Sequence, residues 1–157
     1  MKKKQSWIIA VLVTLILLIS NAFNDSNIYK EVKYTKGIDG DSFYLSIDGK
    51  VTECRLLVVD TPEMKTNDKY AKEAYEFTDG LLKNAKELKV EIEKDYDNYD
   101  KYGRLLIWLF VDGDLLQTKL LEEGLAKIRY IDGDYEYLNR LYKAENKAKE
   151  SKLNLWS

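Results

Sequence analysis

The stretch Arg55-Leu-Leu-Val-Val-Asp-Thr-Pro-Glu63 decides the fold, because it has the pattern of a buried strand that ends at a charged turn. Its apolar run at 56–59 is short and carries two β-branched valines, as strands in protein cores do. Pro62 ends the strand, since proline has no N–H for a ladder and restricts the residue before it. Charges beside a core strand are costly unless they are paired, solvated or bound to a cation. This stretch alone leaves open a simple arginine–carboxylate pair at a strand end.

Two Asp-Gly pairs divide the segment 28–59 into a three-stranded meander. Asp-Gly between extended segments is a strong hairpin signal, and it occurs at 39–40 and at 48–49. The middle segment alternates cleanly between apolar and polar residues, which is typical of a strand with one buried face. We therefore expect strands at 28–35, 42–47 and 50–59.

Helical spacing and two further strands follow along the chain. We expect strands at 88–92 and 105–111, helices at 70–84, 114–123 and 135–150, and an apolar tail at 153–156 that packs back. Asp68 is placed to cap the first helix, and Asp114 with Gln117 forms a capping pattern at the second. This order predicts an α+β fold, a five-stranded OB-type β-barrel with three α-helices.

The 157-residue chain contains no histidine and one cysteine, Cys54. The absence of histidine excludes Ser-His-Asp and Cys-His triads, histidine general bases and the usual zinc sites. Any hydrolysis must therefore use carboxylates, arginine and a hard cation. Cys54 lies within a core strand, so we expect a small core residue and not a nucleophile.

Residues 1–22 have the three-part pattern of a secretory signal. Basic residues at 2–4 precede an apolar run at 7–19, and small residues follow. The run is short for a membrane span of about 20 residues, but two more residues bring it close, so an uncleaved anchor stays open. We expect residues 1–22 to be a signal peptide or N-terminal membrane anchor. Residues 23–157 then form one domain, secreted or held at the extracellular face of the cell membrane.

The domain that remains is acidic. Residues 1–22 hold three of the 25 basic residues and none of the 27 acidic ones, so residues 23–157 carry a net charge of −5. An acidic chain argues against non-specific, charge-driven binding of nucleic acid as the main function. An enzyme tolerates such a surface when its site is locally basic or when a bound cation offsets the charge.

Five short motifs occur in one order along the chain, and each is ordinary by itself. They are Asp39-Gly-Asp41, the stretch 55–63, Asp100-Lys-Tyr-Gly-Arg104, Gly124-Leu-Ala-Lys127 and Lys152-Leu-Asn-Leu-Trp-Ser157. Singly they could be a hairpin turn, a strand end, an ion pair, a helix stop and a packed tail. Together the motifs resemble the staphylococcal nuclease (thermonuclease) family, and the resemblance runs from about residue 34 to residue 157.

The resemblance implies a Ca²⁺ site. Asp41 and Asp60 would bind the ion through their carboxylates, and Thr61 would bind it through its backbone carbonyl. Hard cations prefer such oxygen ligands, and a bound dication neutralises an anionic phosphodiester and orients the attacking water.

The resemblance also implies roles in catalysis and substrate binding. Glu63 would hold or deprotonate the attacking water, and a carboxylate near the metal supplies a base without histidine. Arg55 and Arg104 would clamp the phosphate with planar, bidentate donors. The remaining positions would bind the nucleotide, where tyrosines can stack on a base: Lys101, Tyr102 and Tyr130.

The activity implied is that of a Ca²⁺-dependent endonuclease, a phosphodiesterase that cleaves DNA and RNA to 3′-phosphate products. We expect it to act as a monomer and to prefer single-stranded substrates. A non-catalytic OB-type nucleic-acid-binding domain and a membrane-tethered interaction domain stay open as alternatives.

Three departures from the family pattern bear on substrate preference. Ser42 replaces a threonine, which keeps the hydroxyl. The loop after Glu63 looks shorter and lacks a proline. Asp132 stands where a second nucleotide-binding tyrosine is often found, and its negative charge is expected to weaken nucleotide affinity.

Overall fold

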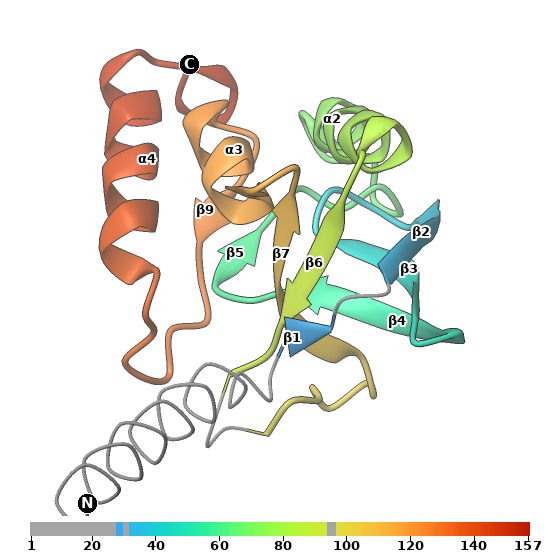
Figure 1. Cartoon of the computed structure of the whole chain (residues 1–157). Helices are drawn as coiled ribbons and strands as arrows, with labels where there is room; N and C mark the ends of the chain where they lie inside the picture. Colours follow the sequence, from blue (N-terminus) through green and yellow to red (C-terminus); the bar gives the residue numbers. More distant parts are fainter. Residues whose placement is uncertain (1–27, 30–31, 94–96) are drawn as a thin grey trace, which may run out of the picture.

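The computed structural model describes residues 28–29, 32–93 and 97–157. The expected signal or anchor at 1–22 lies outside these residues. Within the described ranges, no helix combines the length and the hydropathy needed to span a bilayer. The fold is α+β, with a strongly bent sheet in the middle and helices around it (Figure 1).

One sheet forms the body of the molecule. Its strands are β1 (Ile28–Tyr29), β2 (Val32–Gly37), β3 (Ser42–Ile47), β4 (Lys50–Leu56), β6 (Leu88–Glu91), β7 (Leu105–Val111) and β8 (Asp114–Leu115). The path runs β1-β6-β7-β4-β3-β2, with β8 paired to β7. All pairs are antiparallel except β4 and β7, which run parallel. β2 also contacts β6 across the sheet, so the five long strands curl into the OB-type arrangement predicted from the sequence.

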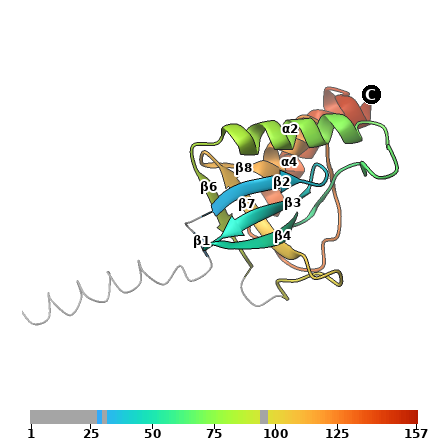
Figure 2. The same ribbon diagram turned by 90° about the vertical axis from the view of Figure 1, so that its right-hand side faces the viewer.

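Three α-helices occur in the described ranges, as predicted. α2 (Ala71–Asn84) lies across one end of the barrel, while α3 (Leu116–Glu122) and α4 (Leu138–Glu150) pack side by side (Figures 1 and 2). The core between these elements includes Trp108, Phe43 and Leu45, none of which is exposed. A short 3₁₀ helix, η1 (Asn154–Trp156), packs back through a hydrogen bond from Leu155 N–H to the Gly124 carbonyl at 3.0 Å.

The two predicted hairpin turns are present. Asp48 and Gly49 join β3 to β4 with φ values of 50° and 81°, the left-handed geometry that suits a two-residue hairpin. The turn at residues 38–41 joins β2 to β3, and it approaches α2 closely. A Cβ added at Gly40 would lie 2.8 Å from the Ala74 Cβ, so only glycine lets this turn sit against the helix.

The predicted strand at 50–59 is wrong as one unit. β4 ends at Leu56, Val58 has a φ of 65°, and the short strand β5 (Val59–Asp60) then pairs with β9 (Lys127–Ile128) in a separate two-stranded sheet. An apolar run carries no signal of this change of partner. The predicted strand at 28–35 corresponds to two elements with different partners, β1, which pairs with β6, and β2, which pairs with β3.

Both predicted helix caps are wrong. Tyr70 precedes α2 in a left-handed conformation without a side-chain cap, and the Asp68 carboxylate instead accepts a hydrogen bond from Glu63 N–H. Leu115 precedes α3, also without a side-chain cap. The Gln117 side chain is fully buried and donates to the Ile107 carbonyl at 2.9 Å. Tertiary hydrogen bonds therefore replace the local ones that the spacing suggested.

Candidate active site

Arg55 lies between two carboxylates. The β3–β4 register aligns it with Ser42, directly after Asp41. Its guanidinium donates to Asp41 Oδ1 at 2.5 Å and to Asp60 Oδ1 at 2.7 Å. Arg55 is 7% exposed and Asp41 is 1% exposed, whereas a third of the Asp60 side chain is open to solvent. The simple arginine–carboxylate pair that the sequence left open is present, but it joins three charges and its outer member faces solvent.

The Asp41 carboxylate is held on both oxygens. Ser42 Oγ donates to Oδ1 at 2.8 Å, and the backbone N–H of Thr61 donates to Oδ2 at 2.7 Å. The backbone carbonyl of Asp41 also accepts from Leu56 N–H at 2.9 Å. These bonds tie the β2–β3 turn to the end of β5. The split of the predicted strand after Leu56 is what brings Thr61 to this turn.

A third carboxylate, Asp39, lies beside the pair. Burial raises the pKa of Asp39 to about 7, and the charges of Asp41 and Glu63 act in the same direction. The neighbourhood thus holds more negative charge than Arg55 offsets. Such an excess favours a cation, because a nearby positive charge stabilises the ionised carboxylates.

The donor set fits a hard cation. A carboxylate offers about four lone-pair positions, and the three hydrogen bonds to Asp41 leave capacity on that group. Asp60 accepts the Arg55 bond on Oδ1, and its other carboxylate oxygen, Oδ2, accepts no hydrogen bond from the described residues. Among the described residues, no three acidic, cysteine or histidine side chains are grouped to hold a metal, so the protein's ligands would be few. Calcium and magnesium sites commonly complete such a set with water or substrate oxygens.

Glu63 stands at the edge of this cluster. The residue is exposed, and within the described part of the chain its carboxylate has no hydrogen-bond or ion-pair partner. Its backbone N–H donates to Asp68 Oδ2 at 3.3 Å, which fixes the loop and leaves the side chain unpaired. A carboxylate of this kind can accept a proton from water.

Arg104 reaches the site from the start of β7. Its Nε donates to Asp100 Oδ2 at 2.7 Å, and its backbone N–H donates to Asp100 Oδ1 at 3.0 Å. Burial alone would raise the pKa of Asp100, but these bonds, with one from Tyr102 N–H, lower it. The ion pair considered from the sequence is therefore formed, and it orients the guanidinium.

Ser42 connects the two arginines. Its hydroxyl oxygen accepts from Arg55 Nη1 and from Arg104 Nη1, each at 3.3 Å, while the same hydroxyl donates to Asp41. Both guanidinium groups thus converge on one oxygen atom. An oxyanion placed beside them would receive planar donors from two directions.

A cleft of about 550 Å³ opens beside the arginines. Seven of the nine predicted site residues line it, namely Arg55, Asp60, Glu63, Lys101, Tyr102, Arg104 and Tyr130. Asp41 and Thr61 lie behind this wall and are buried.

The walls of the cleft carry exposed aromatic rings. Tyr102 is 72% exposed and Tyr130 is 69% exposed, which is unusual for large rings in a folded domain. The Arg104 guanidinium lies 5.4 Å from the Tyr102 ring centroid, and Arg55 lies 5.7 Å from that of Tyr130. Tyr130 has a φ of 57°, a left-handed conformation that turns its side chain out of the strand alternation. The rings thus stand beside the two guanidinium groups, in a cleft that four carboxylates also line.

The sequence of the chain matches a known protein family over most of its length. The sequence pattern of the family described as Staphylococcal nuclease homologue matches residues 53–157. The chain belongs to the staphylococcal nuclease family. The resemblance found from the five motifs is therefore confirmed, and the matched segment contains every predicted site residue except Asp41.

Relatives extend the similarity over the whole chain. The Thermonuclease of Staphylococcus hyicus is 33% identical, over 100% of this chain and 99% of that protein. The Thermonuclease of Staphylococcus intermedius is 30% identical, over 99% of each. Endonuclease YncB of Bacillus subtilis (strain 168) is 37% identical, over 80% of this chain and 61% of that protein.

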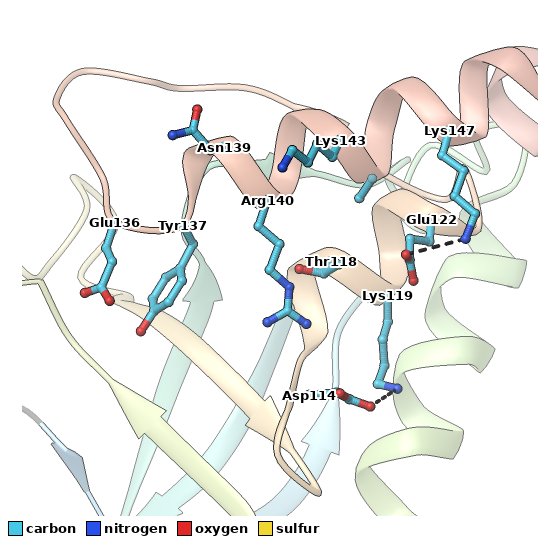
Figure 3. Close-up of a pocket in the computed structure, with 11 residues that line it drawn as sticks. Asp114, Thr118, Lys119, Glu122, Glu136, Tyr137, Asn139, Arg140, Lys143 and Lys147 are labelled. Atoms are coloured by element: carbon cyan, nitrogen blue, oxygen red, sulfur yellow. Dashed lines mark ion pairs between the residues drawn. The ribbon is translucent and has the colours of Figure 1, made fainter.

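A second hollow of similar size, about 580 Å³, lies between α3 and α4 (Figure 3). None of the predicted site residues lines it. Two of its four cations are paired, Lys119 with Asp114 at 2.7 Å and Lys147 with Glu122 at 3.7 Å. Size alone therefore does not identify the functional cleft in this member of the family.

Sequence reasoning missed three residues that shape the site. The Tyr135 hydroxyl donates to the Asp132 carboxylate, and both residues line the cleft. Asp100 orients Arg104, a role that goes beyond the ion pair left open by the sequence. Glu145, in α4, is buried and accepts from Ile128 N–H at 2.8 Å. An acidic residue on the apolar face of a helix was the available signal for Glu145.

Proposed function

We propose that this chain is a Ca²⁺-dependent nuclease that hydrolyses phosphodiester bonds of DNA and RNA and leaves 3′-phosphate ends. The observation that carries the proposal is the convergence of Arg55 and Arg104 on the Ser42 hydroxyl. The buried Asp41 lies directly behind that hydroxyl, and the unpaired Glu63 lines the same cleft. The family membership and the names of the relatives support the same chemistry.

Asp41, Asp60 and the Thr61 carbonyl would hold the cation. A bound Ca²⁺ supplies positive charge that neutralises the phosphodiester and lowers the cost of attack by water. Asp41 is suited to its role because Ser42 and Thr61 fix both of its oxygens. Asp60 is suited to bind the cation because its side chain is partly exposed and lines the cleft.

Arg55 and Arg104 would bind the phosphate oxygens whose charge grows in the transition state. Each now donates to carboxylates, Arg55 to Asp41 and Asp60, and Arg104 to Asp100. A guanidinium has five N–H donors, so each can keep its carboxylate and still offer N–H groups to a phosphate. The carboxylates therefore position the arginines without using up their donors.

Glu63 would hold or deprotonate the attacking water, since its carboxylate is free of partners among the described residues. Lys101, Tyr102 and Tyr130 would hold the nucleotide. Exposed rings beside two guanidinium groups suit an unpaired base and its phosphate, so we propose a preference for single-stranded substrates.

Residues 1–22 would direct export. We propose that they act as a signal peptide or membrane anchor, and that the domain 23–157 works as a monomer outside the cell or at the outer face of its membrane. The absence of an internal disulfide partner for the buried Cys54 is compatible with either place.

The test is cleavage of single-stranded DNA by the purified protein, with added Ca²⁺ or with EDTA. We expect cleavage only with Ca²⁺. Arg104→Ala and Glu63→Ala should each reduce kcat by about a hundredfold or more while the protein stays folded. Arg140→Ala and Glu122→Ala are matched controls in the α3–α4 hollow and should keep activity (Figure 3).

Two results would contradict the proposal. Wild-type protein that binds the DNA but cleaves nothing with Ca²⁺ would favour the non-catalytic alternative. Full turnover by both Arg104→Ala and Glu63→Ala would show that the roles are misassigned.

A further inference from the structure

A second, smaller cleft lies on the other side of the Glu63 edge. It encloses about 270 Å³ and is lined by the loop at 60–63, by Lys69, and by Lys127 and Arg129. It shares Asp60 and Glu63 with the tyrosine-lined cleft. The two hollows are thus adjacent across the residues that carry the proposed chemistry.

The segment 127–130, which begins with β9, sends its side chains to both clefts. The backbone of Lys127 lies opposite that of Asp60 in the β5–β9 ladder, and the N–H of Arg129 donates to the Val58 carbonyl at 2.8 Å. Residues two apart in an extended strand point to the same face, so Lys127 and Arg129 line the smaller cleft together. The positive φ of Tyr130 then turns the next side chain to the larger cleft.

The cations of the smaller cleft are available to an anion. Within the described residues, Lys69, Lys127 and Arg129 form no ion pair. The Lys69 and Lys127 ammonium groups instead lie over aromatic rings, 4.7 Å from the Tyr70 centroid and 5.0 Å from the Trp156 centroid. Neither contact neutralises the ammonium charge, because an aromatic ring carries no formal negative charge.

Two of the three acidic residues that line this cleft are already engaged, and the third, Glu63, is the carboxylate that we propose for the attacking water. Asp60 pairs with Arg55. Asp68 accepts from the Thr66 hydroxyl at 2.8 Å and from Glu63 N–H at 3.3 Å. The contrast with the α3–α4 hollow is clear, since two of the cations there are neutralised by carboxylates in contact (Figure 3).

We infer that the smaller cleft is a second phosphate subsite, in which Lys69, Lys127 and Arg129 bind a phosphate that flanks the scissile one. The strand would cross the Glu63 edge, with its nucleoside in the tyrosine-lined cleft and its neighbouring phosphate among the three cations. This inference rests on the proposed nuclease activity. It accounts for how a domain of net charge −5, residues 23–157, retains a polyanion beyond one nucleotide.

The test compares substrates of increasing length. Full-length wild-type protein and its Arg129→Glu and Arg140→Glu variants are assayed with Ca²⁺ on oligothymidylates from the dinucleotide upward. Both arginines bear no ion pair in the described structure, and they differ in which hollow they line. Arg129→Glu should lower kcat/KM on long substrates by about tenfold and leave the dinucleotide nearly unchanged. It should also reduce the slope of log KM against log salt by about 0.7, the value for one lost phosphate contact on a single strand.

Binding gives a readout that does not depend on turnover. Fluorescence anisotropy with the Glu63→Gln variant, alone and combined with Arg129→Glu, measures affinity for the same oligothymidylates. If Arg129→Glu and Arg140→Glu lower the affinity for long substrates equally, the subsite is overturned. It is also overturned if Arg129→Glu lowers the affinity for the dinucleotide as much as that for long substrates. If the wild type cleaves no substrate, the proposed function is refuted. In that case the binding assay still tests the subsite, which is refuted if Arg129→Glu leaves the affinity for long oligothymidylates unchanged.

Discussion

Asp41 ends the turn between β2 and β3, Arg55 lies in the adjacent strand β4, and they form an ion pair in which both residues are almost fully buried. A buried pair is a weak source of net stability, because desolvation offsets much of the attraction. Removing one partner is strongly destabilising, because the other charge stays buried without a counter-charge. The pair thus links the stability of the β-barrel to the same groups that we propose for catalysis.

The first prediction concerns Arg55→Ala. Loss of the guanidinium leaves the Asp41 carboxylate with Ser42 and Thr61 as its donors. We expect the free energy of unfolding in EDTA to fall by about 3 kcal/mol, as for other buried pairs that lose one partner. Added Ca²⁺ should recover part of this loss. Urea unfolding measures both values, and Arg140→Ala is the control because its guanidinium bears no ion pair in the described structure. A loss under 1 kcal/mol would show that Asp41 does not need a counter-charge.

The second prediction concerns pH and Asp100. Its pKa is lower in the folded protein than in an unfolded chain, so its contribution to stability is present above the ordinary pKa near 4 and fades as the pH falls below it. Asp100→Asn removes this dependence. We expect the wild type to exceed the variant by about 1 kcal/mol at neutral pH and by less in acid. Asp97 lies in the same loop, and among the described residues its carboxylate accepts only from Tyr99 N–H, so Asp97→Asn should show no such trend.

Periodicity and turn chemistry were enough to predict most of the barrel. The apolar run at 105–111 is β7, and the Asp-Gly pairs are hairpin turns. Those signals are local, and they match what a strand and a turn need from their own residues. The break after Leu56 could not be predicted, because β5 is defined by its distant partner β9. The failed cap at Gln117 has the same cause, since a buried carbonyl of β7 outcompetes the local bond.

The candidate site was predicted through its motifs, and the structure adds how its members are connected. Seven predicted residues line one cleft because the turn at 38–41, the end of β5 and the start of β7 meet there. Ser42 as the shared acceptor of two arginines could not be inferred from spacing. This role of Ser42 depends on how β3, β4 and the start of β7 are placed relative to one another.

The third prediction concerns Glu145, which holds β9 in place from α4. Its carboxylate accepts from Ile128 N–H at 2.8 Å and from Lys149 Nζ at 2.6 Å. Glu145→Ala leaves the part-buried Ile128 N–H without its acceptor, so we expect a loss of about 2 kcal/mol in unfolding free energy. Because β9 pairs with β5, Asp60 should also be less well placed, and half-maximal cleavage should need more Ca²⁺. Lys149→Ala removes the ion pair and the contact with the Trp156 ring but keeps the bond to Ile128, so it should change both values less. Unaltered Ca²⁺ dependence in a destabilised Glu145→Ala would limit this residue to a structural role.

The last prediction concerns Asp132, whose carboxylate lines the cleft that we propose for the nucleotide. Asp132→Asn removes a negative charge near the expected phosphate, while its amide oxygen can still accept from the Tyr135 hydroxyl. We expect KM for single-stranded DNA to fall about threefold at low salt, with kcat nearly constant. The gain should shrink at high salt, because mobile ions screen exposed charges. Asp134→Asn makes the same charge change two residues away and outside the cleft, so it should have a smaller effect. Equal gains from both variants would mean that overall charge, and not the position of Asp132, limits substrate affinity.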